Sequence, residues 1–252
     1  LNSAPAKEFI QERAQHATAL HALLSHLSAR TAYLILRYCV SARAIFLPAT
    51  MPTRHLASYL RDSDEATNTA WLRIVSVRKD DPKAQLLLQR KSLPTSMGGS
   101  AIPNAADLAP SALLASAKAT LPLFRELNPA PHDHLLNTLP TTDPLGITAA
   151  FQHCKRVHDT LAATIDPISN YTHKPPTALP EHAHQALLAK QNYTDLTLAK
   201  NLHKMTRLQL MRTYKGDDVH TRALISLIAQ SAPIAGAWLN IPQPSTYIIA
   251  GQ

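Results

Sequence analysis

Apolar residues recur along this chain at the three- and four-residue spacing that places them on one face of an α-helix, and they rarely alternate as they would in a strand. In the first 27 residues, Lys7, Glu8, Glu12 and Arg13 fall away from a series of apolar positions. Those apolar positions are Phe9, Ile10, Ala17, Leu20, Leu24 and Leu27. The pattern predicts an all-α protein built as an irregular multi-helix array.

Prolines and capping residues set the expected ends of the helices. We expect Pro48 and Pro52 to break the chain after the second helix, and Asp81, Asn104 and Asp143 to cap later helices. The expected helices span about 6–27, 30–46, 53–77, 81–91, 104–118, 143–165, 181–214 and 217–230, with loops over 128–143 and 166–180. Pro122 is expected to interrupt the continuation of the 104–118 helix toward Leu127.

The segment 92–103 interrupts the helical pattern. It holds two of the six glycines, Gly98 and Gly99, together with Pro94 and Pro103. Because glycine and proline mark loops and turns, the segment is typical of a hinge. We therefore expect two helical lobes, residues 1–97 and 98–252.

Composition narrows the class of protein. Hydrophobic residues make up 45% of the 252 positions, enough to bury a core, so the chain is expected to fold. The two cysteines, Cys39 and Cys154, are too few for a disulfide framework and favour an intracellular location. The longest apolar run, Tyr33 to Leu47, contains two arginines, so we expect neither a membrane span nor a membrane partner.

The net charge is +8, and most of the surplus lies in the N-terminal part of the chain. Residues 1–103 hold 13 Lys and Arg against 7 Asp and Glu, while residues 104–252 hold 12 against 10. Such a balance favours a polyanionic partner, RNA or DNA first. Candidate nucleic-acid-binding residues form one cluster, Arg73, Arg78, Lys79, Lys83, Arg90 and Lys91, and one helical stripe, Lys200, Lys204, Arg207 and Lys215. The alternative for both sets is an ordinary solvated surface.

Motifs that would indicate catalysis or a cofactor are weak. Gly216-Asp217-Asp218 matches the triplet with which polymerases bind metal ions, but it lies between two helical patterns and is better explained as helix punctuation. Several residues raise the alternative of a zinc site: His132, His134, His153, Cys154, His158, His182 and His184. No Cys-x-x-Cys or His-Glu-x-x-His pattern accompanies them, so we expect no metal, no cofactor and no catalytic residue.

Four segments, in the same order, resemble the region downstream of the polymerase core in LINE-like (non-LTR) retrotransposon reverse transcriptases. They are residues 6–10, 31–39, 93–116 (Leu-Pro-Thr-Ser-Met-Gly-Gly-Ser-Ala-Ile-Pro-Asn-Ala-Ala-Asp-Leu-Ala-Pro-Ser-Ala-Leu-Leu-Ala-Ser) and 231–240. Where that family commonly has Gly-Gly-Leu-Gly, this chain has Gly-Gly-Ser-Ala at 98–101. No position matches the family's catalytic aspartates.

The resemblance implies a non-catalytic segment of a polyprotein, with residues 1–97 as a thumb-like lobe that helps hold template and primer. Its partners would then be RNA or DNA and the adjoining polymerase domain of the same polyprotein. A helical protein-interaction scaffold with no nucleic-acid role is the competing hypothesis. Because phosphate contacts make affinity depend on salt, a salt-dependent titration with RNA or DNA separates the two.

Overall fold

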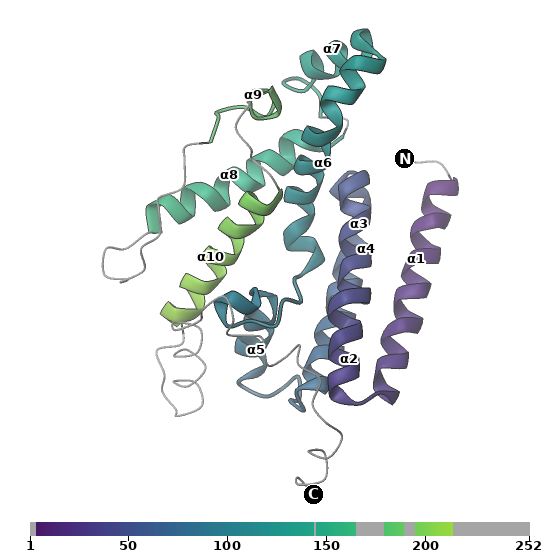
Figure 1. The fold of residues 1–252 in the computed structure, drawn as a ribbon, viewed down its shortest axis with the longest axis vertical. Coiled ribbons are helices and arrows are strands. Elements are labelled where there is room, and N and C mark those ends of the chain that lie inside the picture. Colours follow the sequence, from purple (N-terminus) through teal and green to yellow (C-terminus); the bar gives the residue numbers. More distant parts are fainter. Residues whose placement is uncertain (1–3, 144, 165–178, 189–194, 214–252) are drawn as a thin grey trace, which may run out of the picture.

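A computed structural model describes residues 4–143, 145–164, 179–188 and 195–213. Over those residues it contains helices and no strand, which confirms the predicted all-α class (Figure 1). The α-helices are α1 (Ala4–Leu23), α2 (Ala29–Ile35), α3 (Ser41–Thr50), α4 (Thr53–Ile74), α5 (Ala84–Ser92), α6 (Ala105–Leu127), α7 (Pro129–Thr138), α8 (Ile147–Thr164), α9 (Ala183–Leu188) and α10 (Asp195–Thr213).

The N-terminal helices pack into a layer in which α1, α3 and α4 run side by side (Figure 1). A single π-helical turn over Leu36–Val40 joins α2 to α3, so the two form one nearly continuous rod. The break predicted at Pro48 is wrong, because Pro48 is buried inside α3 and the helix continues to Thr50. Tertiary packing of this apolar helix outweighs the backbone hydrogen bond that proline removes.

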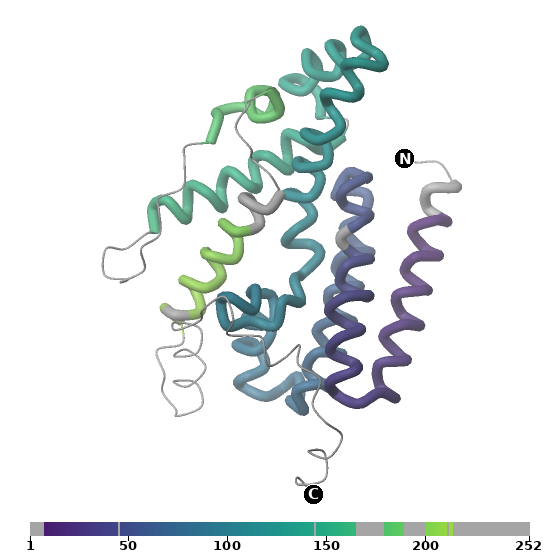
Figure 2. Tube along the Cα trace, viewed as in Figure 1, coloured from purple at the N-terminus to yellow at the C-terminus, as the bar shows by residue number. Residues whose placement is uncertain are grey.

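Helix α6 is the central element of the array and runs from the N-terminal helices toward α7 (Figure 2). Its two ends lie in different cores. Ala105 and Ala109 pack with residues of α3 and α4, while Leu114 and Leu121 pack with residues of α7, α8 and α9. Pro122 does not interrupt the helix, which runs to Leu127 rather than ending near residue 118 as predicted.

The cap at the start of α6 comes from another helix. Asn104 occupies the position before the helix, as predicted, but its side chain makes no capping bond. The carboxylate of Asp64, in α4, instead accepts hydrogen bonds from the backbone N–H groups of Ala105 (2.7 Å) and Ala106 (2.9 Å). A carboxylate at this position satisfies two free amides and interacts favourably with the helix dipole. The predicted cap on α8 is confirmed, because Asp143 accepts from the N–H groups of Thr148 and Ala149.

The glycine-containing segment before α6 is a packed loop, not the predicted hinge. Leu93 and Ile102 are completely buried, and Ala101 donates its N–H to the Leu93 carbonyl at 2.8 Å. The hydroxyl of Tyr33, in α2, donates to the Ser100 carbonyl at 3.0 Å. Ala105 and Ala109 belong to the core of α3 and α4. The division into lobes at 97/98 stays a prediction. The loop lies inside one packed unit.

A second core lies around the C-terminal half of α6. Phe151, Cys154 and Leu161 of α8 are buried there, together with Leu139 after α7 and Leu187 of α9. The loop predicted over 128–143 is wrong over most of its length, since 129–138 form α7. Pro129 takes the first helical position, where proline's missing N–H costs nothing.

The C-terminal predictions are covered only in part. The long helix predicted over 181–214 is described as α9 and α10, with residues 189–194 between them outside the described residues. The helix predicted over 217–230, with its caps at Asp217 or Asp218, lies outside them as well.

Two opposite substitutions test whether the glycine-containing loop before α6 is packed or flexible. A Cβ on Gly99 would lie 2.0 Å from the Leu93 carbonyl oxygen, so Gly99→Ala is expected to lower the free energy of unfolding by about 2 kcal/mol or more. Ala101 holds φ at 51°, a conformation that favours glycine, so Ala101→Gly should raise it by about 1 kcal/mol. Urea denaturation measures both. A flexible hinge would tolerate the first change and gain nothing from the second.

Candidate nucleic-acid interface

The predicted cluster before the loop does not present six free cations. Arg78 pairs with Asp80 at 3.3 Å, and Lys79 pairs with Glu65 of α4, all four side chains being well exposed. Arg73 is exposed at the end of α4, and Lys83, which precedes α5, is half-buried. Exposed ion pairs contribute little to stability, and here they reduce the positive field that a phosphate would meet.

Lys91 is not a surface residue, which corrects its assignment to the binding cluster. Its side chain is completely buried, and its ammonium donates to the Asn104 side-chain oxygen at 2.8 Å. Burial lowers the pKa of Lys91 to about 8, against the opposing attraction of Asp64 and Asp107. These groups form a polar network between α4, α5 and α6, because Asn104 in turn donates to Asp107 at 2.9 Å.

Arg90 also has a structural role. Its guanidinium donates to the Gly98 carbonyl at 2.7 Å, which ties α5 to the loop that follows. Burial lowers its pKa, and the side chain is only partly exposed. Arg90 and Lys91 are therefore used to hold the loop and the start of α6.

The predicted stripe on α10 is only partly on the surface. Lys200 is exposed and Lys204 is half-buried, but Arg207 is only 3% exposed and lies near the face of the buried Leu210. The prediction that Arg207 is a nucleic-acid-binding surface residue is therefore corrected. The aliphatic stem of arginine can pack in a core, so a helical wheel of charged and apolar letters placed this residue on the wrong face. Lys215 lies outside the described residues.

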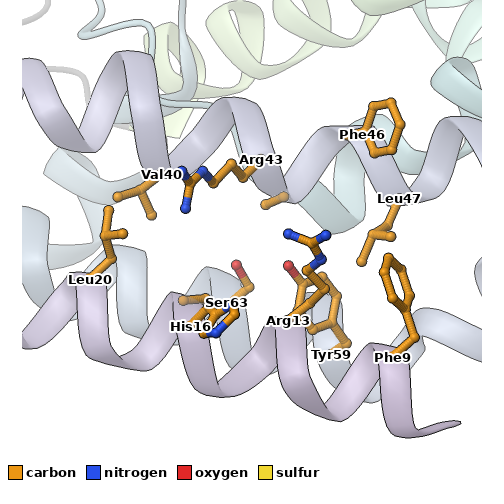
Figure 3. Close-up of a pocket in the computed structure, with 12 residues that line it drawn as sticks. Phe9, Arg13, His16, Leu20, Val40, Arg43, Phe46, Leu47, Tyr59 and Ser63 are labelled. Carbon is orange, nitrogen blue, oxygen red and sulfur yellow. The ribbon is translucent and has the colours of Figure 1, made fainter.

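A different surface has the features expected of a nucleic-acid interface. Between α1, α3 and α4 lies a cavity of about 450 Å³, which we call the arginine groove (Figure 3). Arg13 of α1 and Arg43 of α3 both extend into it from facing walls. The other labelled residues of its lining are Phe9, His16 and Leu20 of α1, Val40, Phe46 and Leu47 on the α3 side, and Tyr59 and Ser63 of α4.

The groove exists because α1 is attached mainly to α4. The ring of His21 hydrogen-bonds to the Thr67 hydroxyl at 3.2 Å, and Ile10 and Ala14 pack against the core of α3 and α4. On α1, Phe9, Arg13 and Leu20 recur at helical spacing and so share the face that lines the groove. Across the cavity this face is opposite α3.

No described carboxylate lies within ion-pairing distance of Arg13 or Arg43. Asp62 and Glu65 of α4 line a separate cavity on the other side of α1, with His21 and Arg73. Two guanidinium groups that face one cavity without a counter-charge repel each other, so an anion bound between them is favoured. The groove is therefore a basic site with apolar and aromatic walls.

Aromatic side chains lie beside these cations. The Arg13 guanidinium lies 5.0 Å from the centre of the Phe9 ring, within cation–π range. Phe46 is 65% exposed at the rim. Burial raises the pKa of the Tyr59 hydroxyl, with the Arg13 charge opposing that shift.

The sequence carries a signal for this site in its distribution of charge. Residues 13–61 contain six arginines and no aspartate, glutamate or lysine. Counting charges by halves of the chain hides this, because the acids that follow from Asp62 onward partly cancel the total. A scan for long acid-free stretches would have pointed to α1 through α4 before α5.

The described residues hold no group of three or more His, Cys, Asp or Glu side chains placed to bind a metal ion. His132 and His158 are buried and each contacts the aspartate that follows it, at 2.8 Å and 3.2 Å. The Gly216-Asp217-Asp218 triplet lies outside the described residues.

One helical run, Ala29–Thr50, meets the length and hydropathy criteria for a membrane span, with a mean hydropathy of 1.3. Buried residues make up 47% of its most apolar window, and the core helix of a soluble protein meets the same criteria. The expectation that the chain has no membrane span stays a prediction.

Comparison of the chain with protein-family models, with curated proteins and with solved structures gives no match. The assignment of function therefore depends on the geometry and charge of the chain itself, together with the sequence resemblance described above.

The buried network predicts an unusual dependence of stability on pH. In the native state Lys91 loses its proton near pH 8, whereas in the unfolded chain it keeps it to about pH 10.5. The unfolded state then binds more protons in this window, so stability rises with pH. Relative to Lys91→Met, the native chain should gain about 2 kcal/mol between pH 7 and pH 10. Urea denaturation of both proteins across that range measures the difference; parallel profiles would show that Lys91 is not desolvated.

Proposed function

We propose that this chain is a non-catalytic helical segment of a LINE-like reverse-transcriptase polyprotein, and that it holds single-stranded RNA or DNA at the arginine groove, beside the polymerase core. The observation that carries the proposal is the pair of guanidiniums, Arg13 and Arg43, that face one aromatic-lined cavity with no described carboxylate near them. Proteins that bind single strands combine such a basic groove with aromatic rings on which bases stack.

The shape of the groove favours a single strand over a duplex. Its walls include the exposed ring of Phe46 and the ring of Phe9, which offer apolar faces next to the cations. Bases in a duplex are stacked on one another and cannot reach such rings, while an unpaired base can. A volume of about 450 Å³ lies within the range of ligand pockets and fits one nucleotide.

The backbone of the loop before α6 is compatible with the proposed family. Ala101, with φ at 51°, occupies the position where the LINE-like segments commonly have the fourth residue of Gly-Gly-Leu-Gly. A positive φ is the conformation for which glycine is favoured. The backbone here thus has the shape that the family's usual residue would adopt without strain, which supports descent from a glycine-containing sequence.

One observation favours the competing scaffold function. Leu123 and Leu127, one helical turn apart near the end of α6, are 60% and 80% exposed, and Leu188 of α9 is 58% exposed. A group of exposed leucines fits a protein surface, such as the adjoining polymerase domain that the resemblance implies. Binding of nucleic acid at the groove and of protein at this end of α6 are compatible.

Paired substitutions test the proposed interface against the cluster predicted from sequence. Arg13→Gln with Arg43→Gln should weaken binding of a 12-nucleotide single-stranded RNA about tenfold or more, and should reduce the slope of log affinity against log salt by about 1.4, as expected for two lost phosphate contacts. The matched control, Arg78→Gln with Lys79→Gln, removes the same charge from ion-paired residues and should change both quantities much less.

Fluorescence anisotropy at two salt concentrations measures these affinities, and circular dichroism checks that both variants keep their helices. Equal losses in the two variants would mean that net charge alone attracts the RNA. No appreciable binding by the native chain at either salt concentration would leave the scaffold function.

A further inference from the structure

Two hydroxyl groups lie on the floor of the arginine groove. Tyr59 and Ser63, one turn apart on α4, are each only 6% exposed. Among the described residues neither hydroxyl has a hydrogen-bond partner. Figure 3 shows both directed into the cavity between Arg13 and Arg43. Both hydroxyls face the space between the two arginines, where they can donate hydrogen bonds to a ligand that accepts them.

The donors around this cavity match one chemical group in number and charge. Two guanidiniums supply two positive charges and several N–H groups, and the two hydroxyls supply further donors from the floor. A phosphodiester inside a strand carries one negative charge, whereas a terminal phosphomonoester carries about 1.5 to 2 at neutral pH and three strong acceptor oxygens. Two guanidiniums from separate helices are better balanced by the second group.

The shape of the site leads to the same group. The cavity is closed on one side by α4, so a strand cannot pass through it in that direction, and about 450 Å³ holds one nucleotide at most. We infer that the arginine groove binds the phosphorylated end of a nucleic-acid strand, with Arg13 and Arg43 on the phosphate oxygens, Tyr59 and Ser63 donating from below, and the terminal base against Phe9 or Phe46. This inference rests on the proposed function.

The experiment compares three fluorescent eight-nucleotide strands of one sequence on the full 252-residue chain: one with a 5′-phosphate, one with a 3′-phosphate and one with hydroxyls at both ends. One of the phosphorylated strands should bind about tenfold more tightly than the hydroxyl strand, because hydrogen bonds to a charged group are stronger than neutral ones. The strand that gains identifies which end is bound.

Variants assign the preference to the groove. Arg43→Gln should abolish the difference between the strands, and Tyr59→Phe with Ser63→Ala should reduce it. Arg61→Gln is the control, because Arg61 is exposed on α4 and does not line the groove.

The outcomes separate the inference from the proposed function. Equal binding of all three strands, still weakened by Arg43→Gln, would overturn the terminal-phosphate inference and leave single-strand binding at the groove intact. A preference that persists unchanged in Arg43→Gln and in the Tyr59 and Ser63 double variant would also overturn it. Failure of all three strands to bind would contradict the proposed function, and the inference with it.

Discussion

The hydrogen bonds from the first two amides of α6 to Asp64 are the interaction on which the remaining architecture depends. Helix α6 carries one core at its start and another at its end, so its position decides how α7, α8 and α9 lie relative to α3 and α4. A helix that begins inside the protein must have its free N–H groups satisfied there. Asp64 accepts these hydrogen bonds from its position in α4, so polar contacts attach α6 to the N-terminal layer in addition to the apolar cores.

The same arrangement buries Lys91, and removing its charge from water costs free energy. Burial raises the pKa of Asp64 and lowers that of Lys91, although each charge attracts the other. In many proteins the desolvation penalty of two buried charges exceeds the free energy of their attraction. Such a network therefore contributes more to the specificity of the packing geometry than to the free energy of unfolding. Here the specified geometry is the meeting of α4, α5 and α6, with Asn104 between Lys91 and Asp107.

The helical class was predictable, and most of the site was not. Spacing of apolar residues determines secondary structure locally, and the cap at Asp143 is a local feature, so both were found from sequence. The cap at Asp64 lies 41 residues from the amide that it satisfies, which no local pattern encodes. Lys91 and Arg207 were predicted to be surface residues and are buried, for a related reason. The identity of a lysine or arginine does not tell whether its aliphatic side chain packs in a core. The loop predicted over 128–143 is wrong because Pro129 takes the first helical position of α7, where proline is well tolerated.

The arginine groove follows from how α1 is held. Because α1 is fastened to α4 by His21 and by a few apolar residues, its opposite face remains open toward α3, and charges on that face are free to converge. Arg13 and Arg43 bring two positive charges to one cavity, and a bound anion would be attracted to both walls. Ligand binding and the attachment of α1 are therefore linked: whatever occupies the groove must also stabilise the N-terminal layer, because it binds the folded arrangement of α1, α3 and α4 and cannot bind the separated helices in the same way.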